Sequence, residues 1–448
     1  MNSAIERADD RSSRRDFIKS SAVASAVTVA GTPISARSSS KIRVGLVGCG
    51  RRGTQALIDM AEASQDIEII ALGELFEDRL QESIARLRYQ KGDPYPWDAM
   101  RFQSRGKRPM LPDCLKITPE TCFTGFDAYK KVINSGVDAV LLACPPHFRA
   151  RHMRAAVEAG KHVWIEKPVA TDPVGVRSII ESSEIASEKN LSVLGSTENR
   201  RRRSYIETIK RIHNGAIGDI ISGQLYFVMG DYFGGARVID RQSGWSDMEY
   251  QCRNWLYFTW LSGDFFVEIM VHHLDVVNWV MGSHPVKALG TGGRQSHTDP
   301  KFGNLYDHYT VVYEYPNGAE VTCIGRQAPD TSTRSEVCIY GTKGKADPSK
   351  SIEGDAPFTY KWDNSDPHVQ EHREFVASIQ QGKPLAEGRR VAESTLTGIM
   401  GRMSAYTGQE ATWDWVLNES QLDLSPERYE FKNLPVRPLP VPGKTPLR

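Results

Sequence analysis

Short apolar runs alternate with amphipathic stretches across residues 41–197. The first run, residues 42–47, is rich in β-branched side chains, as expected of a strand that is buried on both faces. Helical stretches such as residues 54–63 and 78–88 separate the runs, and a polar, proline-dotted stretch at 92–121 is longer than a normal connection. The alternation predicts a doubly wound parallel sheet with right-handed crossovers, and the polar stretch predicts a surface insertion.

The pattern changes after Arg200, where turn signals such as Pro316-Asn317-Gly318 separate strand-like runs. These runs cover residues 220–228, 286–290, 309–315, 320–323 and 335–340. Three helical stretches accompany them, at residues 268–280, 369–380 and 391–406. We therefore predict an α/β chain in which a doubly wound domain, residues 41–197, precedes an α+β domain, residues 198–448, with a large open, mostly antiparallel sheet.

The first apolar run ends in a glycine-rich turn. Gly48, Gly50 and Gly53 form G-x-G-x-x-G between a strand and a helix, the register that holds a dinucleotide pyrophosphate at the helix N-terminus. The next apolar run ends at Glu74, 26 positions after Gly48 (74 − 48), near the distance at which a carboxylate meets the adenosine ribose. A glycine turn without a ligand is the alternative, but this context favours a Rossmann nucleotide-binding domain.

The same residues bear on which dinucleotide binds. Glu74 would repel a 2′-phosphate and pair with a ribose hydroxyl, which favours NAD. Arg51 and Arg52 leave NADP as the alternative, because an arginine in the phosphate turn could accept a 2′-phosphate. We therefore predict NAD and count both arginines among the cofactor-binding residues.

Composition narrows the classes of function. The 448 residues carry a net charge of +1, so no bulk charge draws the chain to nucleic acid or to a membrane surface. The seven cysteines are scattered and form no C-x-x-C pair, which indicates neither a disulfide framework nor a zinc site. These features predict a soluble globular protein without a nucleic-acid partner.

The first 40 residues are predicted to lie outside the fold. Residues 13–19, Ser-Arg-Arg-Asp-Phe-Ile-Lys, precede a mildly apolar stretch at 20–30, and together they resemble a twin-arginine export signal. The apolar stretch is too short to span a bilayer, so no membrane insertion is predicted. We expect export to the periplasm by the twin-arginine machinery, with a disordered basic tail as the alternative. Because that route carries folded proteins, the nucleotide is expected to be tightly bound before export.

One candidate catalytic residue lies in Glu166-Lys167-Pro168, directly after the predicted strand at 162–165. Residues at the carboxyl ends of parallel strands face the ligand crevice, so Lys167 would point toward the nicotinamide end of a bound dinucleotide. A lysine there can hydrogen-bond a substrate hydroxyl or relay its proton. A lysine in a surface turn is the alternative.

A second cluster lies on the predicted helix at 268–280. Glu268, His272 and Asp275 fall on one face of it, and this arrangement suits proton removal from an alcohol. It also suits a divalent metal, but no third ligand is evident and no metal is predicted. His273, the neighbouring histidine, is interpreted as a buried structural residue.

Two further groups of residues have open interpretations. The aromatic stretch that contains Arg253 and Trp255 could hold a sugar ring, but such a stretch is equally typical of core. The four arginines at 200–203 are predicted to form a solvated basic face, with one or two reaching the cofactor or a carboxylate.

Several motifs together resemble the glucose-fructose oxidoreductase/inositol dehydrogenase/rhizopine catabolism family, Gfo/Idh/MocA. They are VGLVGCGRRG, Gly73-Glu74, GKHVWIEKPVA and the histidine helix, and the resemblance extends from Lys41 to about Trp415. It implies a Rossmann domain, then a domain whose open sheet supports the substrate site and often oligomer contacts, so a homo-oligomer is expected. It also implies NAD(P)-dependent oxidation or reduction of a sugar or cyclitol carbon.

The resemblance also implies roles for individual residues. Lys167 matches the E-K-P lysine, and His272 matches the helix histidine that serves as acid or base, with Glu268 orienting them. Pro145, His147 and Glu166 are implied as further cofactor-binding residues, and Arg253, Trp255 and Asp275 are expected to contact substrate.

The sequence departs from the family pattern at several positions. Glu268 stands where an aspartate is common and Met270 where glycine is usual, so a longer carboxylate and a larger neighbour would reshape the pocket. Arg149 follows Cys144-Pro145-Pro146-His147 where family members often carry histidine. Two alternative functions therefore stay open: an NAD-dependent glycosidase that oxidises its sugar transiently, and a non-catalytic, nucleotide-stabilised sugar-binding protein.

Overall fold

The computed structural model describes residues 41–88, 111, 113–230 and 238–448. The predicted export signal and most of the predicted insertion at 92–121 lie outside the described residues. None of the helices in the described part of the chain is long and apolar enough to cross a bilayer.

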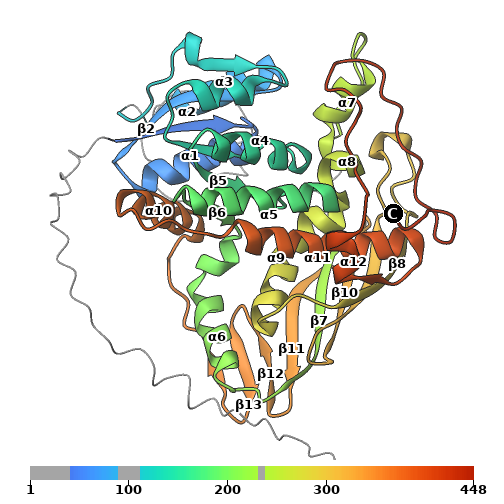
Figure 1. Ribbon diagram of the computed structural model, residues 1–448. Helices are drawn as coiled ribbons and strands as arrows, with labels where there is room; N and C mark the ends of the chain where they lie inside the picture. Colours follow the sequence, from blue (N-terminus) through green and yellow to red (C-terminus); the bar gives the residue numbers. More distant parts are fainter. Residues whose placement is uncertain (1–40, 89–110, 112, 231–237) are drawn as a thin grey trace, which may run out of the picture. The chain divides into compact units, whose positions relative to one another are not determined.

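Six parallel strands form the first sheet, in the order β3-β2-β1-β4-β5-β6 (Figure 1). The strands are β1 (Ile42–Val47), β2 (Ile67–Glu74), β3 (Cys122–Thr124), β4 (Ala139–Leu142), β5 (His162–Glu166) and β6 (Val193–Ser196). The connecting helices are α1 (Arg51–Ala63), α2 (Glu77–Arg88), α3 (Ala128–Asn134), α4 (Pro146–Glu158) and α5 (Pro173–Glu188). This order confirms the predicted doubly wound Rossmann sheet, whose ligand crevice lies outside the carboxyl ends of β1 and β4.

The second sheet has nine strands, in the order β14-β13-β12-β11-β7-β10-β9-β8-β15. They are β7 (Ile220–Met229), β8 (Lys287–Gly293), β9 (His308–Glu314), β10 (Glu320–Gln327), β11 (Arg334–Gly341), β12 (Gly344–Asp347), β13 (Ser351–Gly354), β14 (Phe358–Thr359) and β15 (Ala411–Thr412). Only β7 and β10 pair in parallel, so the predicted, mostly antiparallel sheet is confirmed.

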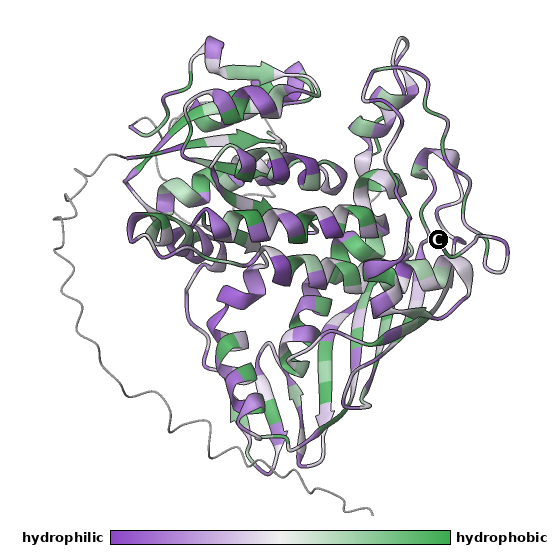
Figure 2. Cartoon of the chain, viewed as in Figure 1, coloured by the Kyte–Doolittle hydropathy of each residue, from purple (hydrophilic) through white to green (hydrophobic). Residues whose placement is uncertain are grey.

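Helices cover one face of the second sheet. The helices of this half are α6 (Arg203–His213), α7 (Asp247–Arg253), α8 (Thr259–Ser262), α9 (Asp264–Met281), α10 (Pro367–Gln380), α11 (Gly388–Thr407) and α12 (Trp413–Asn418). Alternate residues of β9, Tyr309, Val311 and Tyr313, are fully buried, as expected for a sheet with one covered face. Figure 2 shows hydrophobic residues along the strands of both sheets.

The two halves share their packing. Phe375 and Val376 of α10 belong to the same buried cluster as the strands of the first sheet, although they lie far beyond residue 197. Backbone hydrogen bonds also join Val193 of β6 to the segment before α11, through the carbonyl of Leu385 and the amide of Glu387. The helix α10 and the segment before α11 therefore tie the second half of the chain to the Rossmann half.

Two of the four arginines at 200–203 reach carboxylates, as predicted for one or two of this group. The Arg200 guanidinium donates to the Asp275 carboxylate, with Nε 2.9 Å from Oδ2, and Arg390 donates to the same carboxylate at 3.0 Å. Arg201 is also buried and forms ion pairs with Glu387 and Glu374. Although burial alone would raise it, Arg200 and Arg390 hold the pKa of Asp275 below its usual value. These ion pairs join α9 to the segment after β6, which carries Arg200, and to α11, which carries Arg390.

Candidate active site

The glycine turn is shaped for close contact with a ligand. Gly48 has φ 97°, and a Cβ there would lie 2.3 Å from the backbone nitrogen of Cys144, while a Cβ on Gly53 would lie 2.0 Å from the Gly48 oxygen. A Cβ on Gly50, by contrast, would meet open space. Gly50 provides no side-chain cap for α1, so the first amides of the helix face that space and can receive an anion such as a pyrophosphate.

Glu74 lies at the end of β2 beside this turn. Its Oε2 accepts a hydrogen bond from the Cys49 amide at 2.7 Å, and its Oε1 accepts one from the Leu75 amide at 2.7 Å. Burial raises the pKa of this carboxyl. The structure thus brings Glu74 to the place where a ribose hydroxyl would meet a carboxylate, and the turn and the acid together fit a dinucleotide.

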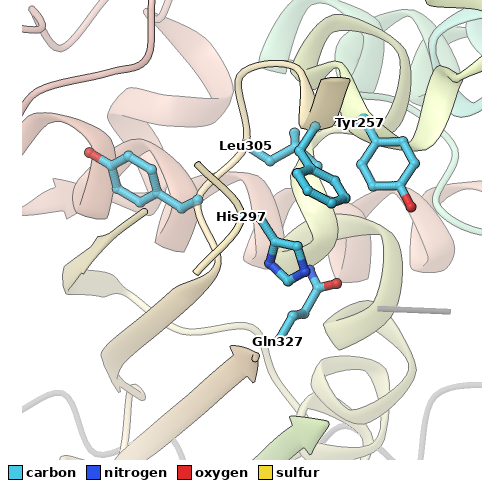
Figure 3. A pocket seen from close by; sticks show the side chains of 6 residues that line it. Tyr257, His297, Leu305 and Gln327 are labelled. Atoms are coloured by element: carbon cyan, nitrogen blue, oxygen red, sulfur yellow. The ribbon is translucent and has the colours of Figure 1, made fainter. Parts of the chain in front are cut away.

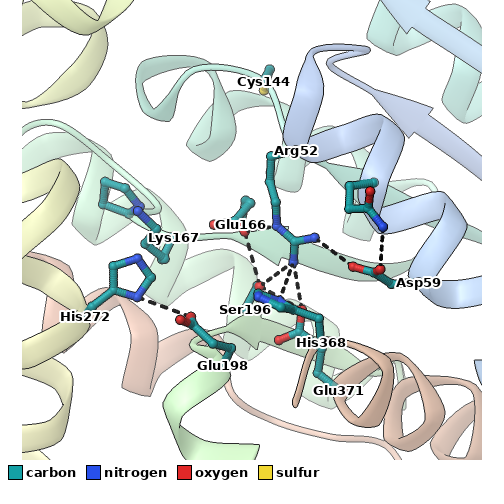
Figure 4. A network of polar contacts seen from close by, with 12 residues as sticks. Arg52, Asp59, Cys144, Glu166, Lys167, Ser196, Glu198, His272, His368 and Glu371 are labelled. Atoms are coloured by element: carbon teal, nitrogen blue, oxygen red, sulfur yellow. Dashed lines mark hydrogen bonds and ion pairs between the residues drawn. The ribbon is translucent and has the colours of Figure 1, made fainter. Parts of the chain in front are cut away.

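Arg52 differs from its predicted role as a 2′-phosphate ligand. Its guanidinium donates to Glu166 at 2.7 Å, to Glu371 at 2.9 Å and to Asp59 at 3.3 Å (Figure 4). All three carboxylates are buried. A guanidinium committed to these acids is not available to a phosphate. Arg51, the other arginine of the turn, has an exposed side chain.

Lys167 and Glu268 meet across the two halves of the chain. The Lys167 ammonium, which follows β5, donates to the backbone oxygen of Glu268 at 2.7 Å and lies 3.2 Å from its Oε1. Arg149 fixes the turn that carries the lysine, since it donates to the carbonyl oxygens of Cys144 and Pro168 at 2.8 and 2.5 Å. The arginine that departs from the family pattern therefore supports the position of Lys167.

His272 lies one helical turn after Glu268 on α9, and it has a partner that the sequence did not reveal. Its Nδ1 is 3.2 Å from Oε2 of Glu198, in the short 3₁₀ helix η4 (Glu198–Arg201) (Figure 4). Glu198 lies just after β6, as Lys167 lies just after β5. This position at the carboxyl edge of the sheet was the sequence feature that could have identified Glu198 as a site residue. His273 faces away, toward Phe227 of β7, and burial lowers its pKa to about 4.

Met270 is the other residue of this helix that departs from the family pattern, and it packs against the second sheet. It is fully buried, and a Cβ on Gly325 of β10 would lie 3.5 Å from its sulfur. The methionine therefore packs against a strand that has no side chain at the contact. This packing does not support the expectation that Met270 reshapes the pocket.

The three predicted substrate contacts lie in different surroundings. Asp275 is 1% exposed and its carboxylate is occupied by Arg200 and Arg390, so it is not open to substrate. Arg253 pairs with Asp78 of α2 at 2.9 Å and its guanidinium lies 4.0 Å from the Phe76 ring, beside the loop that follows β2. Trp255 is partly buried against the core. None of these contacts places them with Lys167 and His272.

A segment near the C-terminus lies against the carboxyl edge of the first sheet. We call residues 424–434 the C-terminal strap. Phe431 stacks on Phe76 after β2 and contacts Phe126 after β3, with ring centroids 5.8 and 5.1 Å apart. The Tyr429 hydroxyl lies 2.9 Å from Nε2 of His147 at the start of α4. The strap thus spans the loops after β2, β3 and β4, and it contacts the predicted cofactor residue His147.

A separate pocket contains none of the predicted site residues. It is lined by Tyr257, His297, Phe302, Leu305, Tyr306 and Gln327 (Figure 3). In the described part of the chain, no group of three or more histidine, cysteine, aspartate or glutamate residues could hold a metal ion.

Comparisons with known proteins agree with the fold. Residues 42–194 match the model described as oxidoreductase family, NAD-binding Rossmann fold, and residues 205–347 match the GFO/IDH/MocA C-terminal domain. A myo-inositol 2-dehydrogenase of Thermotoga maritima is 21% identical over 386 residues, which are 83% of this chain and 95% of that protein. A glycosyl hydrolase family 109 protein of Streptomyces coelicolor is 25% identical over 68% of this chain and 58% of its own length.

A solved structure shares the fold. It is that of scyllo-inositol dehydrogenase from Lactobacillus casei with bound NAD(H) and scyllo-inositol, with a TM-score of 0.59 and 17% identity. The superposition covers 83% of this chain and 99% of that one.

Substitution of Arg52 tests the buried ion-pair network. Arg52→Ala leaves Glu166, Glu371 and Asp59 without their cation, and we expect the free energy of unfolding to fall by about 3 kcal/mol in urea titrations. The control is Arg51→Ala, which removes the same charge from an exposed side chain of the same turn and should cost less than about 0.5 kcal/mol. Equal losses in the two variants would contradict the network's importance.

Proposed function

Because the chain belongs to the GFO/IDH/MocA family of oxidoreductases, we propose that it transfers hydride between NAD and a hydroxyl-bearing carbon of a sugar, sugar derivative or cyclitol. The observation that carries this proposal is the meeting of Lys167, Glu268 and His272 at the carboxyl edge of β5 and β6, in the crevice of a nucleotide-binding sheet. The inositol dehydrogenases of Thermotoga maritima and Lactobacillus casei support the substrate class.

The residues of the glycine turn would hold the cofactor. The amides at the start of α1 would receive the pyrophosphate, and Glu74 would accept a hydrogen bond from a ribose hydroxyl, which favours NAD over NADP. Pro145, His147 and Glu166 follow β4 or end β5 along the same edge. When bound, the nicotinamide supplies the hydride acceptor or donor.

The chain itself supplies the proton transfer. His272 takes the proton of the substrate hydroxyl during oxidation and returns it during reduction. Lys167 donates to two oxygens of Glu268 and has a third N–H with which to donate a hydrogen bond to the substrate oxygen as charge develops there. Both Lys167 and Glu268 are 8% exposed, and the scarcity of water strengthens these interactions.

The C-terminal strap supports tight retention of the nucleotide. Tyr429 and Phe431 lie over the loops after β2, β3 and β4, which in this fold border the adenosine end of the cofactor. Aromatic rings that cover this edge would slow release. Such retention suits a protein that leaves the cytoplasm with its cofactor.

One second candidate has specific support. The similarity to a glycosyl hydrolase family 109 protein favours a glycosidase that oxidises its sugar transiently and reduces it again. Incubation with a panel of cyclitols, sugars and glycosides separates the candidates. An increase in the absorbance of reduced nicotinamide supports the dehydrogenase, and cleavage of a glycoside without net reduction of the nicotinamide supports the glycosidase. Binding without either reaction would leave only the non-catalytic sugar-binding protein.

Two substitutions test the roles of the proposed catalytic residues. We expect Lys167→Ala and His272→Ala each to lower kcat by at least about 100-fold, because each removes a group that bonds or deprotonates the substrate hydroxyl. Steady-state kinetics measures the effect, and Lys343→Ala, in the exposed turn between β11 and β12, is the control. The assignment is wrong if both variants keep wild-type turnover.

Truncation of a strap residue tests retention. Tyr429→Ala removes the hydroxyl contact with His147 and the ring beside Phe126, and we expect nucleotide release to become about tenfold faster. Release is followed by nucleotide exchange, and chromatography after denaturation identifies NAD or NADP. The control is Tyr360→Ala, which lies after β14 at the edge of the second sheet. Unchanged release from the Tyr429 variant would show that the strap does not retain the nucleotide.

The export proposal has its own test. Residues 13–19 match a twin-arginine motif, and we expect Arg14→Lys with Arg15→Lys to keep the full-length protein in the cytoplasmic fraction while the wild type reaches the periplasm. Arg11→Lys, outside the motif, is the matched control and should be exported. Export of the double variant, or cytoplasmic retention of the wild type, would overturn the proposal.

A further inference from the structure

We propose that Glu198 is a positioning residue that holds His272 with its Nδ1–H directed at the carboxylate, so that Nε2 presents a lone pair to the substrate hydroxyl. This inference rests on the proposed function, in which His272 is the base. Glu198 does not touch the reacting atoms and acts only through the imidazole.

The chemistry of the two groups in contact determines which ring nitrogen carries the proton. Oε2 of Glu198 lies 3.2 Å from Nδ1 of His272. An ionised carboxylate only accepts hydrogen bonds, so a neutral imidazole in this contact must carry its proton on Nδ1. The opposite nitrogen, Nε2, is then unprotonated and is the one that can accept a proton.

The surroundings keep Glu198 ionised. Although burial alone would raise it, His272, His368 and Arg202 hold the pKa of Glu198 well below its usual value. Arg202 approaches the other carboxylate oxygen, with Nη2 3.9 Å from Oε1. The carboxylate therefore carries its charge at neutral pH, where it favours the imidazolium that forms when His272 takes a proton.

The contact joins elements that are far apart in sequence. Glu198 follows the last strand of the Rossmann sheet, and His272 lies on α9 in the second half of the chain. From α9, Glu268 and His273 also lie beside His272, and Lys167 approaches from the end of β5 through its contact with Glu268. Of these groups, Glu198 places a carboxylate oxygen 3.2 Å from Nδ1 of His272.

Nuclear magnetic resonance tests the tautomer without turnover. In protein with nitrogen-15 in its histidines and no added substrate, the His272 signals, assigned by their loss in His272→Ala, should show a protonated Nδ1 and an unprotonated Nε2. In Glu198→Ala, we expect the population to shift toward the Nε2–H tautomer. A wild-type imidazole with its proton on Nε2, or an unchanged tautomer in the variant, would overturn the proposal.

The pH dependence of kcat/KM tests the role of the negative charge of Glu198. Glu198→Gln should lower kcat by at least about tenfold with little change in KM, and the acidic limb of kcat/KM should move to lower pH, because the imidazolium loses its neighbouring carboxylate. Glu198→Asp should restore part of kcat. Glu207→Gln, on the exposed side of α6, is the matched control.

The outcomes separate this inference from the proposed function. If His272→Ala keeps wild-type turnover, His272 is not the base and the proposed mechanism fails. If His272→Ala is inactive while Glu198→Gln leaves the pH profile and kcat unchanged, the assignment of His272 as the base is kept and the positioning role of Glu198 is wrong. A folded Glu198→Gln protein is verified by its thermal unfolding, which should match that of the control.

Discussion

The pairing of the Arg52 guanidinium with three buried carboxylates is the constraint on which the arrangement of the site depends. It holds carboxylates from α1, from the end of β5 and from α10 within 3.3 Å. Buried carboxylates are tolerated only when their cation stays in place, so the glycine turn, the strand that ends at Glu166 and α10 are fixed relative to one another. Lys167 is the next residue along the chain, and its position therefore follows from the same network.

The site is completed by contacts between the two halves of the chain. Lys167 with Glu268 and His272 with Glu198 each pair a residue at the edge of the Rossmann sheet with a residue of α9. The ion pairs of Asp275 with Arg200 and Arg390 hold α9 in place through a residue that lies outside these two pairs. The candidate site is thus formed by contacts between the two halves of the chain, and neither half contains it alone.

Local patterns predicted much of this structure, because strands buried on both faces, the glycine turn and the long helix of Glu268 and His272 each have a signature in neighbouring residues. The three-residue strand β3 is too short to show such a pattern. Arg52 and Asp275 were assigned to ligands because local sequence shows charge but not the distant partner that neutralises it. Glu198 and Tyr429 of the C-terminal strap were missed for the same reason, since their partners His272 and His147 lie 74 (272 − 198) and 282 positions away along the chain.

The central claim is that hydride passes between the substrate carbon and a nicotinamide held by this chain. The most direct test is a single turnover with a cyclitol or sugar that carries deuterium on the carbon to be oxidised, followed by mass spectrometry of the released nucleotide. Deuterium is expected on the nicotinamide ring in the wild type, and its transfer should be at least about 100-fold slower in the His272→Ala variant. Substrate consumption with an unlabelled nicotinamide would contradict it.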